Sequence, residues 1–205
     1  MRRYLALGDS YTIGTGASTP EAAFPARLAV RLQAVLGEAV EVVNPAVNGF
    51  TTADLVREEL PLLSRLRADL VSVLIGANDI ARGWPEAAYG SALRAIYDAI
   101  ASHVARPDAV VAVSVPDWSV TPAARDFGRP AEIAGRIERC NAAAAAEAGA
   151  RGFLFADVTE ASRSRQPGWL STDQLHPGDP QYAAWADAIW AAVGLRWARA
   201  VAVAG

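Results

Sequence analysis

The sequence predicts an α/β protein in which five parallel strands lie between helices. Short runs of β-branched and other apolar residues alternate with longer segments at helical spacing, which is the pattern of repeated βαβ units. Of the 205 residues, 52% are hydrophobic, which is enough for one sizeable core. No spacer rich in Ser, Gly or Pro divides the chain, so we expect a single domain over residues 1–205.

The first two strands are expected at residues 4–8 and 40–44, with a helix between them. The first strand is a short apolar run that stops at a glycine followed by an acid and a hydroxyl. Apolar residues between 24 and 35 recur every three or four positions, and Gly37 stands where a helix commonly ends. This part of the chain therefore forms the first βαβ unit.

A second helix and the strongest strand come next. Thr51 and Asp54 have the spacing of a capping box, and the helix that they open is expected to continue through Leu63. Residues 69–75 are almost continuously apolar, as in a strand buried on both faces. We therefore expect this strand at the centre of the sheet.

The rest of the chain repeats the pattern. The expected elements are a helix over 89–104, a strand over 109–115, a helix over 133–144, a strand over 152–157 and a last helix that begins near Asp179-Pro180. Asp179 before Pro180 resembles an acidic cap with proline in the first turn. The irregular stretch 116–130 is long enough to indicate a functional role.

Charge and composition exclude several classes of protein. The formal net charge is -3, and all 19 basic residues are arginine, because the chain has no lysine. Without lysine, neither a P-loop nor Schiff-base chemistry is available. The arginines are scattered and form no basic run interleaved with aromatic residues, so we expect no nucleic-acid partner.

The sequence predicts a cytoplasmic protein without a transmembrane segment. No apolar run approaches the roughly 18 residues that a spanning helix needs. Arg2-Arg3 lead directly into the first strand, with no apolar signal-peptide core or cleavage site. The lone Cys140 rules out an internal disulfide and fits a reducing compartment.

Ser10 directly follows the first strand. Ligands of open α/β sheets bind just beyond the carboxyl ends of the strands, so a serine there is well placed to meet a substrate. The same position also suits a serine that only caps a helix. Ser10 is therefore a candidate nucleophile whose role depends on what lies around it.

Of the two histidines, only His176 has an acid at a useful spacing. Asp173 lies three residues earlier, and on a tight turn its carboxylate can accept a hydrogen bond from one ring nitrogen. The other nitrogen is then free to take a proton from a hydroxyl. An exposed turn that caps the last helix is the alternative interpretation. His103 has no acid at that spacing and is expected to be structural.

Gly49 and Asn78 also follow strands. A glycine between a strand end and a helix start leaves its N–H open to a substrate oxygen, and the Asn78 amide offers further N–H donors. Together with the N–H of Ser10, these groups could surround a developing oxyanion. The alternative is that both residues only form turns.

Four segments resemble the sequence blocks of the SGNH, or GDSL, hydrolase family. They occur in the family's order and read Gly8-Asp9-Ser10, Asn48-Gly49, Gly76-Ala77-Asn78-Asp79 and Asp173-Gln174-Leu175-His176. The resemblance implies a flavodoxin-like, three-layer α/β/α sandwich. It also implies roles for the candidate residues: Ser10 as nucleophile, His176 as base, Asp173 as partner of the base, and Ser10, Gly49 and Asn78 as oxyanion donors.

Two positions depart from the family pattern. Tyr11 stands where the family name would have leucine, which is expected to alter the wall beside the nucleophile without changing the catalytic assignment. Cys140-Asn141 resembles a Tyr-Asn pair in many relatives, with cysteine in place of the aromatic residue, and we assign it no catalytic role.

Other routes to catalysis are not supported. The chain has no Gly-x-Ser-x-Gly elbow, which argues against an α/β-hydrolase serine, and Gly14-Thr15-Gly16 lacks the third glycine of a dinucleotide loop. One cysteine and two distant histidines give no metal-ligand cluster. We therefore expect neither a cofactor nor a metal.

The predicted function is that of a serine esterase, a carboxylic ester hydrolase that acts on small-molecule esters through an acyl-enzyme on Ser10. Trp84, Trp118 and Trp169 follow strands at the expected catalytic edge and are candidates to line an acyl or sugar site, with buried packing as the alternative. No long apolar lid is evident, so short or medium acyl chains are expected.

Several alternatives share the same residues. The family also includes carbohydrate deacetylases, lysophospholipases and thioesterases, and transfer of the acyl group to an acceptor other than water would use the same site. A catalytically silent binding module is the alternative from another class. It would ordinarily tolerate the loss of one of the four blocks, and none is lost.

Overall fold

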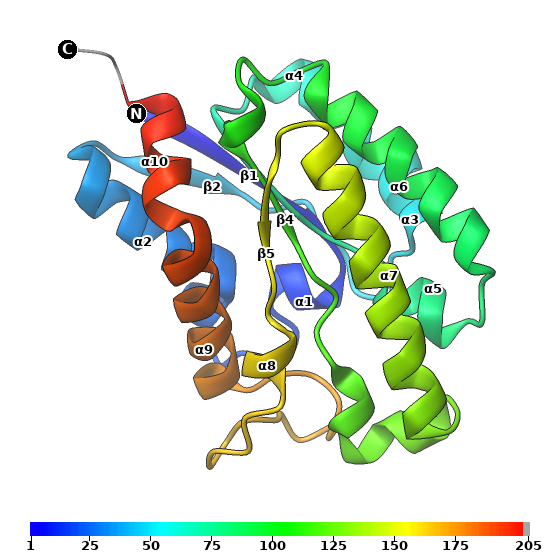
Figure 1. The fold of residues 1–205 in the computed structure, drawn as a ribbon. Coiled ribbons are helices and arrows are strands. Elements are labelled where there is room, and N and C mark those ends of the chain that lie inside the picture. The colour runs from blue at the N-terminus through cyan, green and yellow to red at the C-terminus, as the bar shows by residue number, and fades with distance from the viewer. Residues whose placement is uncertain (203–205) are drawn as a thin grey trace.

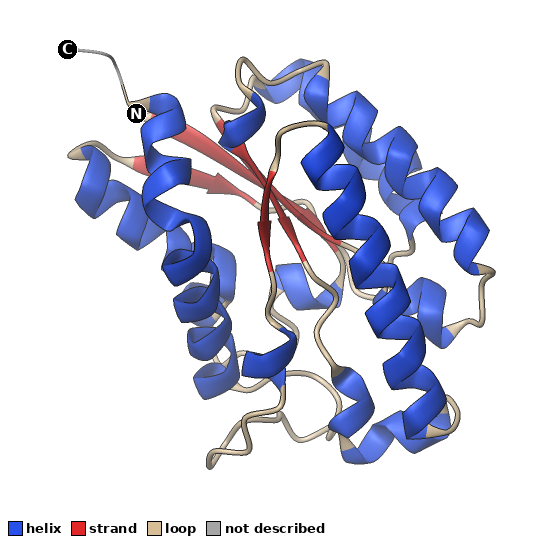
Figure 2. Ribbon diagram, in the orientation of Figure 1, coloured by secondary structure: helices blue, strands red, loops and turns tan. Residues whose placement is uncertain are grey.

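Five parallel strands form one sheet in the computed structural model, which describes residues 1–202 (Figure 2). The strands are β1 (Arg2–Gly8), β2 (Val40–Val43), β3 (Leu70–Leu74), β4 (Val110–Val113) and β5 (Leu154–Ala156). Their order across the sheet is β2-β1-β3-β4-β5, and each neighbouring pair is parallel. β3 is therefore central, as predicted from its continuous apolar run.

Helices cover both faces of this sheet (Figure 1). In residues 1–202 they are α1 (Ser10–Ile13), α2 (Phe24–Leu36), α3 (Thr52–Asp54), α4 (Leu63–Leu66), α5 (Ala77–Ala81), α6 (Glu86–Ala101), α7 (Pro130–Ala150), α8 (Thr159–Ser162), α9 (Asp179–Ile189) and α10 (Leu195–Val201). α2 packs against α9 and α10 on one side, and α6 packs against α7 and α3 on the other. The predicted three-layer α/β/α sandwich is confirmed.

The core lies between the sheet and its two helical layers. All five residues of β3 are buried, because both of its faces are covered. Tyr4 packs edge-on against Trp197 of α10, with ring centroids 5.0 Å apart. The Trp197 indole N–H donates to the carbonyl of Ala109 at 2.8 Å, which satisfies its polar atom within the core.

Two local signals from the sequence are present in the structure. Gly37 ends α2 in the left-handed conformation, with a φ of 70°. Thr51 and Asp54 form the complete capping box, in which each side chain accepts a hydrogen bond from the other's backbone N–H. Both signals are confirmed as helix boundaries.

The helix expected to continue to Leu63 does so, but with an irregular hydrogen-bond pattern. After α3 the chain forms a π-helical turn (Leu55–Glu59), a 3₁₀ turn (Leu60–Leu62) and then α4. Pro61 accounts for the irregular pattern, because it has no N–H and its ring clashes with the carbonyl four residues earlier. In the π turn the N–H of Leu60 reaches back to the carbonyl of Leu55, five residues earlier.

The start of α9 also differs in detail from the prediction. Gly178 is the N-cap, and Asp179 is the first helical residue. The Asp179 carboxylate accepts hydrogen bonds from the N–H and the hydroxyl of Ser18, at 2.8 and 2.6 Å. The acid therefore ties the segment after α1 to α9 instead of capping its own helix.

The carboxyl ends of β1, β3 and β4 meet at one edge of the sheet, because the strands are parallel and adjacent. Ser10, Asn78 and Trp118 follow these three strands, so the topology brings residues far apart in the sequence to the same edge. None of the helices within residues 1–202 combines the length and apolar character needed to cross a bilayer.

Candidate active site

Ser10 is the first residue of α1, in a tight turn after β1. Gly8 has a φ of 156°, and a Cβ there would lie 2.2 Å from Oγ1 of Thr12 and 2.3 Å from the carbonyl oxygen of Leu74. Only glycine therefore fits this position. Asp9 caps α1 by accepting a hydrogen bond from the N–H of Tyr11 at 3.0 Å. The turn leaves Ser10 only 5% exposed.

The loop before α9 carries His176 and is closed by its own backbone. The N–H of Ser171 donates to the carbonyl of His176 at 2.9 Å, and Leu170 forms an antiparallel bridge with Pro177. Gln174, at the tip of the loop, adopts a left-handed φ of 59°. This local closure presents the imidazole of His176 to the edge of the sheet.

Asp173 is held in the same loop by hydrogen bonds to both of its oxygens. Oδ1 accepts from the N–H groups of Leu175 and His176, each at 2.9 Å, and from the Ser171 hydroxyl at 2.7 Å. Burial opposes ionisation, but these bonds and the one from His176 outweigh it and hold the pKa of Asp173 well below its usual range. Asp173 is therefore a carboxylate at neutral pH.

The three side chains form a continuous hydrogen-bonded line. Oδ2 of Asp173 lies 2.6 Å from Nδ1 of His176, and Nε2 of His176 lies 3.0 Å from the hydroxyl oxygen of Ser10. A carboxylate accepts only, so the neutral ring carries its proton on Nδ1 and leaves Nε2 as the acceptor. This arrangement allows the imidazole to take a proton from the serine hydroxyl.

The three candidate oxyanion donors differ in their surroundings. As the first residue of α1, Ser10 has no partner for its N–H within the helix. Nδ2 of Asn78 donates to the carbonyl of Phe50 at 2.9 Å and lies 3.5 Å from Oδ2 of Asp9. Gly49 has a φ of 85° with open space on its Cβ side, and Arg82 donates to its carbonyl at 2.9 Å.

A small cavity adjoins the serine and the histidine. Its volume is about 40 Å³, room for roughly three water molecules. The polar part of its wall is Ser10, Asn78 and His176, and the rest is Tyr11, Ala77, Ala81, Trp118, Phe127 and Leu175. Gly49 is not part of this wall, so the structure places two of the three candidate donors at the cavity.

Tyr11, the residue that departs from the family pattern, forms part of this wall. The Tyr11 ring lies 5.8 Å from the imidazole of His176 and 5.5 Å from the indole of Trp185, measured between centroids. Burial raises the pKa of Tyr11 well above its usual value, so its phenol is neutral. Tyr11 therefore supplies a flat, uncharged surface beside the imidazole.

Two of the three candidate tryptophans lie near the serine. Trp118 lines the cavity at Ser10, and both Trp118 and Trp169 line an adjoining cavity of about 10 Å³. Trp84 lines neither of them, and its carbonyl instead accepts a hydrogen bond from Arg136 of α7. The adjoining cavity is also lined by Trp185, which the sequence pattern marked only as part of a helical stripe.

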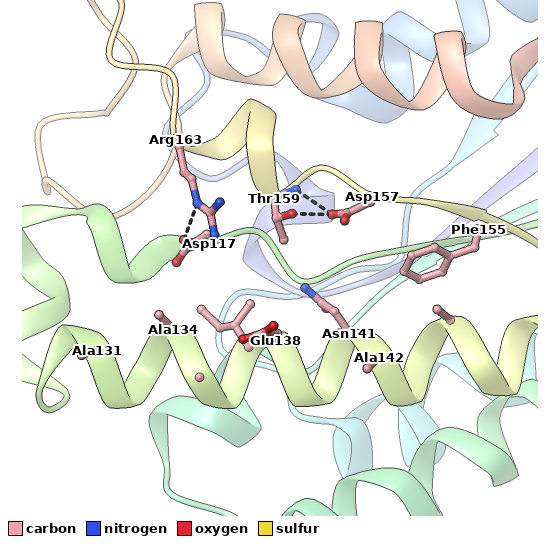
Figure 3. A pocket seen from close by; sticks show the side chains of 13 residues that line it. Asp117, Ala131, Ala134, Glu138, Asn141, Ala142, Phe155, Asp157, Thr159 and Arg163 are labelled. Carbon is pink, nitrogen blue, oxygen red and sulfur yellow. Dashed lines mark hydrogen bonds and ion pairs between the residues drawn. The ribbon is translucent and has the colours of Figure 1, made fainter.

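The loop that carries Trp118 is held from two sides. Asp117 lines a larger groove of about 680 Å³ between α7 and the segment after β5, where Figure 3 shows its carboxylate facing Arg163. Nε of Arg163 donates to Asp117 at 2.8 Å. Asn141 of α7 pairs with both the N–H and the carbonyl of Val115, each at 2.8 Å. These contacts fix the backbone at Val115 and Asp117, just before Trp118.

No metal site accompanies these groups in the described part of the chain. Within residues 1–202, no three or more His, Cys, Asp or Glu side chains are grouped so that they could hold a metal ion. Cys140 is buried in α7, and burial raises its pKa to about 11, so the thiol stays protonated at neutral pH.

A hydroxyl, an imidazole and a carboxylate in hydrogen-bonded sequence are the arrangement of serine hydrolases. The chain belongs to the GDSL-like lipase/acylhydrolase family, whose family model matches residues 6–184. The match covers all four sequence segments that resemble the SGNH blocks. None of the curated proteins matches the chain in sequence.

Solved structures of similar fold include three enzymes. A lipase/acylhydrolase from Enterococcus faecalis is 24% identical with a TM-score of 0.73, and the match covers 96% of this chain and 97% of that chain. Axe2, an acetylxylan esterase from Geobacillus stearothermophilus, is 23% identical with a TM-score of 0.73, covering 96% and 95%. An extracellular lipase from Streptomyces rimosus is 23% identical with a TM-score of 0.69, covering 94% and 100%. At these identities the likeness shows the fold.

Proposed function

We propose that the protein hydrolyses carboxylic esters of short to medium acyl chains through an acyl-enzyme on Ser10. The observation that carries the proposal is the line from Asp173 through His176 to Ser10, with distances of 2.6 and 3.0 Å. Membership of a lipase/acylhydrolase family supports it independently. The two together favour ester cleavage over the other uses of a serine at a strand end.

The proposed reaction has two halves. In the first, the oxygen of Ser10 attacks the ester carbonyl while Nε2 of His176 takes the hydroxyl proton, and the alcohol leaves with that proton. In the second, His176 takes a proton from water, which attacks the acyl-serine; the bond from the acyl carbon to the Ser10 oxygen then breaks, His176 returns the proton to that oxygen, and the acid is released. Asp173, ionised at neutral pH, stabilises the imidazolium that forms in each half.

The N–H groups of Ser10 and Gly49 and the amide of Asn78 are the proposed donors to the oxyanion. Each such donor commonly lowers the barrier by roughly 3 to 4 kcal/mol. Asn78 donates to Phe50 in this structure, so engaging a substrate oxygen requires the amide to share or exchange that bond. The open side of Gly49 is compatible with the close approach of a substrate.

The size of the cavity favours the short end of the acyl range. A cavity of about 40 Å³ beside Ser10 has room for an acetyl group, whereas a long hydrocarbon chain would extend beyond it. Phe127, which is half exposed, packs edge-on against Trp118 at 5.7 Å and closes one side of that cavity. Longer chains would have to displace this pair or lie along the surface.

A graded series of p-nitrophenyl esters from acetate to palmitate tests both parts of the proposal. The wild type should show its highest kcat/KM at the short esters, and Ser10→Ala should lose at least about 10⁴-fold. Activity retained by Ser10→Ala would reject Ser10 as nucleophile. A maximum at palmitate would reject the assignment of short to medium chains while leaving the nucleophile in place.

Sugar acetates are the second candidate substrates. Trp118 is buried, but Trp169 is only partly buried at the adjoining cavity, so its flat ring is the one available to contact a sugar face. An acetylated methyl xyloside and cyclohexyl acetate make a matched pair for this test, because both are acetates of six-membered rings. A preference for the sugar that falls in Trp169→Leu would support this candidate, and equal rates would reject it.

Thioester substrates, fluorophosphonate labelling and added alcohols distinguish the remaining candidate functions. Hydrolysis of a thioester over the matched oxygen ester would favour a thioesterase. The absence of any turnover, together with the absence of fluorophosphonate labelling, would favour the silent binding module. Ester formation from added alcohols would reveal acyl transfer.

A further inference from the structure

β1 extends beyond its neighbour β2 in the residues just before Ser10. In the parallel pairing of β1 with β2, the last pair is Leu5 with Val43, whereas the pairing of β1 with β3 continues to Gly8 with Leu74. The three residues at the end of β1 therefore lack a strand partner on the β2 side. A buried backbone N–H that faces this side needs another acceptor, because leaving it unpaired is costly.

Glu59 supplies that acceptor. Its Oε2 lies 2.9 Å from the N of Gly8, and the residue is only 1% exposed. Glu59 is the last residue of the π-helical turn Leu55–Glu59, and its neighbours Arg57 and Glu58 face the solvent. A carboxyl side chain from the layer of helices thus takes the place of the missing strand.

Burying the Glu59 carboxyl costs free energy, which indicates that its contact with Gly8 is more than incidental. Its Oε1 has no hydrogen-bond partner among the described residues, and a buried carboxyl without full pairing is among the most expensive groups in a protein. Burial raises the pKa of Glu59 to about 8, although the bond from Gly8 lowers it, so the group is largely neutral at pH 7. Its one hydrogen bond goes to the turn that presents Ser10.

A second polar side chain holds the other end of this turn. Nδ2 of Asn44, the residue after β2, donates to the carbonyl of Thr12 in α1 at 2.7 Å. Glu59 and Asn44 therefore bind the turn before and after Ser10, on the side where the sheet provides no strand. Glycine at position 8 imposes no rigidity of its own, so the backbone there depends on these contacts and on its pairing with β3.

We propose that Glu59 is a positioning residue, which fixes Gly8 and thereby holds the Ser10 oxygen within hydrogen-bond distance of His176. The inference rests on the proposed role of Ser10 as nucleophile. Glu59 touches none of the reacting atoms and acts only through the backbone of the turn. Because a misplacement of about 1 Å can cost about 10²-fold in rate, a lost anchor two residues from the nucleophile should be visible in catalysis.

Two substitutions at position 59 distinguish the hydrogen bond to Gly8 from the ability of the side chain to ionise. Glu59→Leu removes the acceptor and keeps an apolar side chain, and Glu59→Gln keeps an oxygen that can accept from Gly8 but can never ionise. Glu59→Leu should lower kcat about 30- to 100-fold with KM within about threefold of wild type, whereas Glu59→Gln should restore kcat to within about threefold. The second-order rate of fluorophosphonate labelling should follow kcat in both variants.

Tyr4→Phe is the matched control. It removes a buried hydrogen bond of 2.7 Å, between the Tyr4 hydroxyl and Ser72, from the opposite end of the same strand. It should lower thermal stability and leave kcat and the labelling rate unchanged. If Glu59→Leu does not fold, Glu59→Asp, which shortens the side chain by one methylene, is judged by the same criterion.

The outcomes are distinct from those for the proposed function. Normal kcat and labelling in Glu59→Leu, with activity that still depends on Ser10, would overturn the role of Glu59 alone. Equal loss in Glu59→Leu and Glu59→Gln would also overturn it, because the acceptor would then not be what matters. Labelling or turnover that survives in Ser10→Ala would overturn the proposed function itself.

Discussion

The two halves of the candidate site are built in different ways. The turn that carries Ser10 is buried and held by a strand, by Glu59 and by the packing around Gly8, where no side chain fits. The loop that carries His176 lies near the surface, with the side chain of Asp173 46% exposed and that of His176 13% exposed. It is held mainly by hydrogen bonds to the Asp173 carboxylate and by its own backbone.

This difference predicts how each half responds to substitution. Changes in the serine turn should disturb packing and therefore lower stability and activity together. Changes in the histidine loop should lower activity with little effect on stability, because exposed side chains contribute little to the free energy of folding. Substitutions in each half test that contrast.

Asp173→Asn should give the largest loss of activity. An amide can donate to Nδ1 of His176 and so favour the wrong tautomer of the ring, for which a loss of kcat of about 10⁴-fold is expected. The melting temperature should change by only a few degrees, because the side chain is half exposed. Steady-state kinetics and calorimetry on the same sample check both statements. A loss of activity matched by a comparable loss of stability would remove the contrast.

Gly8→Ala should lower stability and activity together. The added Cβ meets Thr12 and the carbonyl of Leu74 at less than 3 Å, so strain and overpacking should lower the free energy of unfolding by about 2 to 5 kcal/mol. Gly37→Ala is the control, because Gly37 also has a positive φ but open space around it, and should cost about 1 kcal/mol. Urea unfolding measures both, and equal losses would contradict the packing argument.

Glu59→Gln should change how stability depends on pH. The pKa of Glu59 is about 8 in the folded protein, above the ordinary value of 4.5, so the native state binds a proton that the unfolded chain releases between these values. The contribution of Glu59 to stability is therefore fully present below about pH 4.5 and is lost as the pH rises through 8. Glutamine cannot ionise, so the Glu59→Gln variant does not lose stability in this way.

The melting temperature of Glu59→Gln relative to wild type should accordingly rise between pH 5 and pH 8.5. Asp9, whose pKa burial raises to about 7, is present in both proteins and contributes to both curves. Glu58→Gln, at the exposed neighbouring position, should show no such trend. A constant difference between Glu59→Gln and wild type over this range would show that Glu59 is ionised in the folded protein.

Ser171→Ala should have the smallest effect. It removes one of the three hydrogen bonds to Oδ1 of Asp173 and leaves the two backbone bonds in place. One such bond is worth about 1 kcal/mol, which corresponds to about a fivefold loss in kcat. Thr172→Ala, in the same loop and exposed, is the control and should match wild type. A loss above about 100-fold would mean that the backbone does not hold Asp173.

Most of the fold could be predicted from the sequence, because its signals are local. Continuous apolar runs give the strands, and Gly37 and the capping box at Thr51 mark helix boundaries. The spacing of Asp173 and His176 also predicts their contact, since three residues on a tight turn bring the side chains together. Ser10, Gly49 and Asn78 could be proposed as site residues because each follows a strand, and the ends of parallel strands meet at one edge of the sheet.

The features of the fold and the site that could not be predicted from the sequence depend on contacts between distant parts of the chain. The bond from Gly8 to Glu59 joins residues 51 positions apart, and it exists only because β2 ends before β1 does. Trp84, like Trp118, follows a strand in the sequence. It lines neither cavity near Ser10, because α5 lies between that strand and Trp84. The irregular turns before Leu63 could be predicted from Pro61, which cannot donate an N–H within the helix.

Mass-spectrometric mapping of fluorophosphonate on the wild-type protein and on Ser10→Ala shows directly whether Ser10 is the nucleophile. We expect one adduct per chain, on the peptide that contains Ser10, and none in the variant. An adduct on any other residue, or undiminished labelling of Ser10→Ala, would contradict the assignment of the nucleophile.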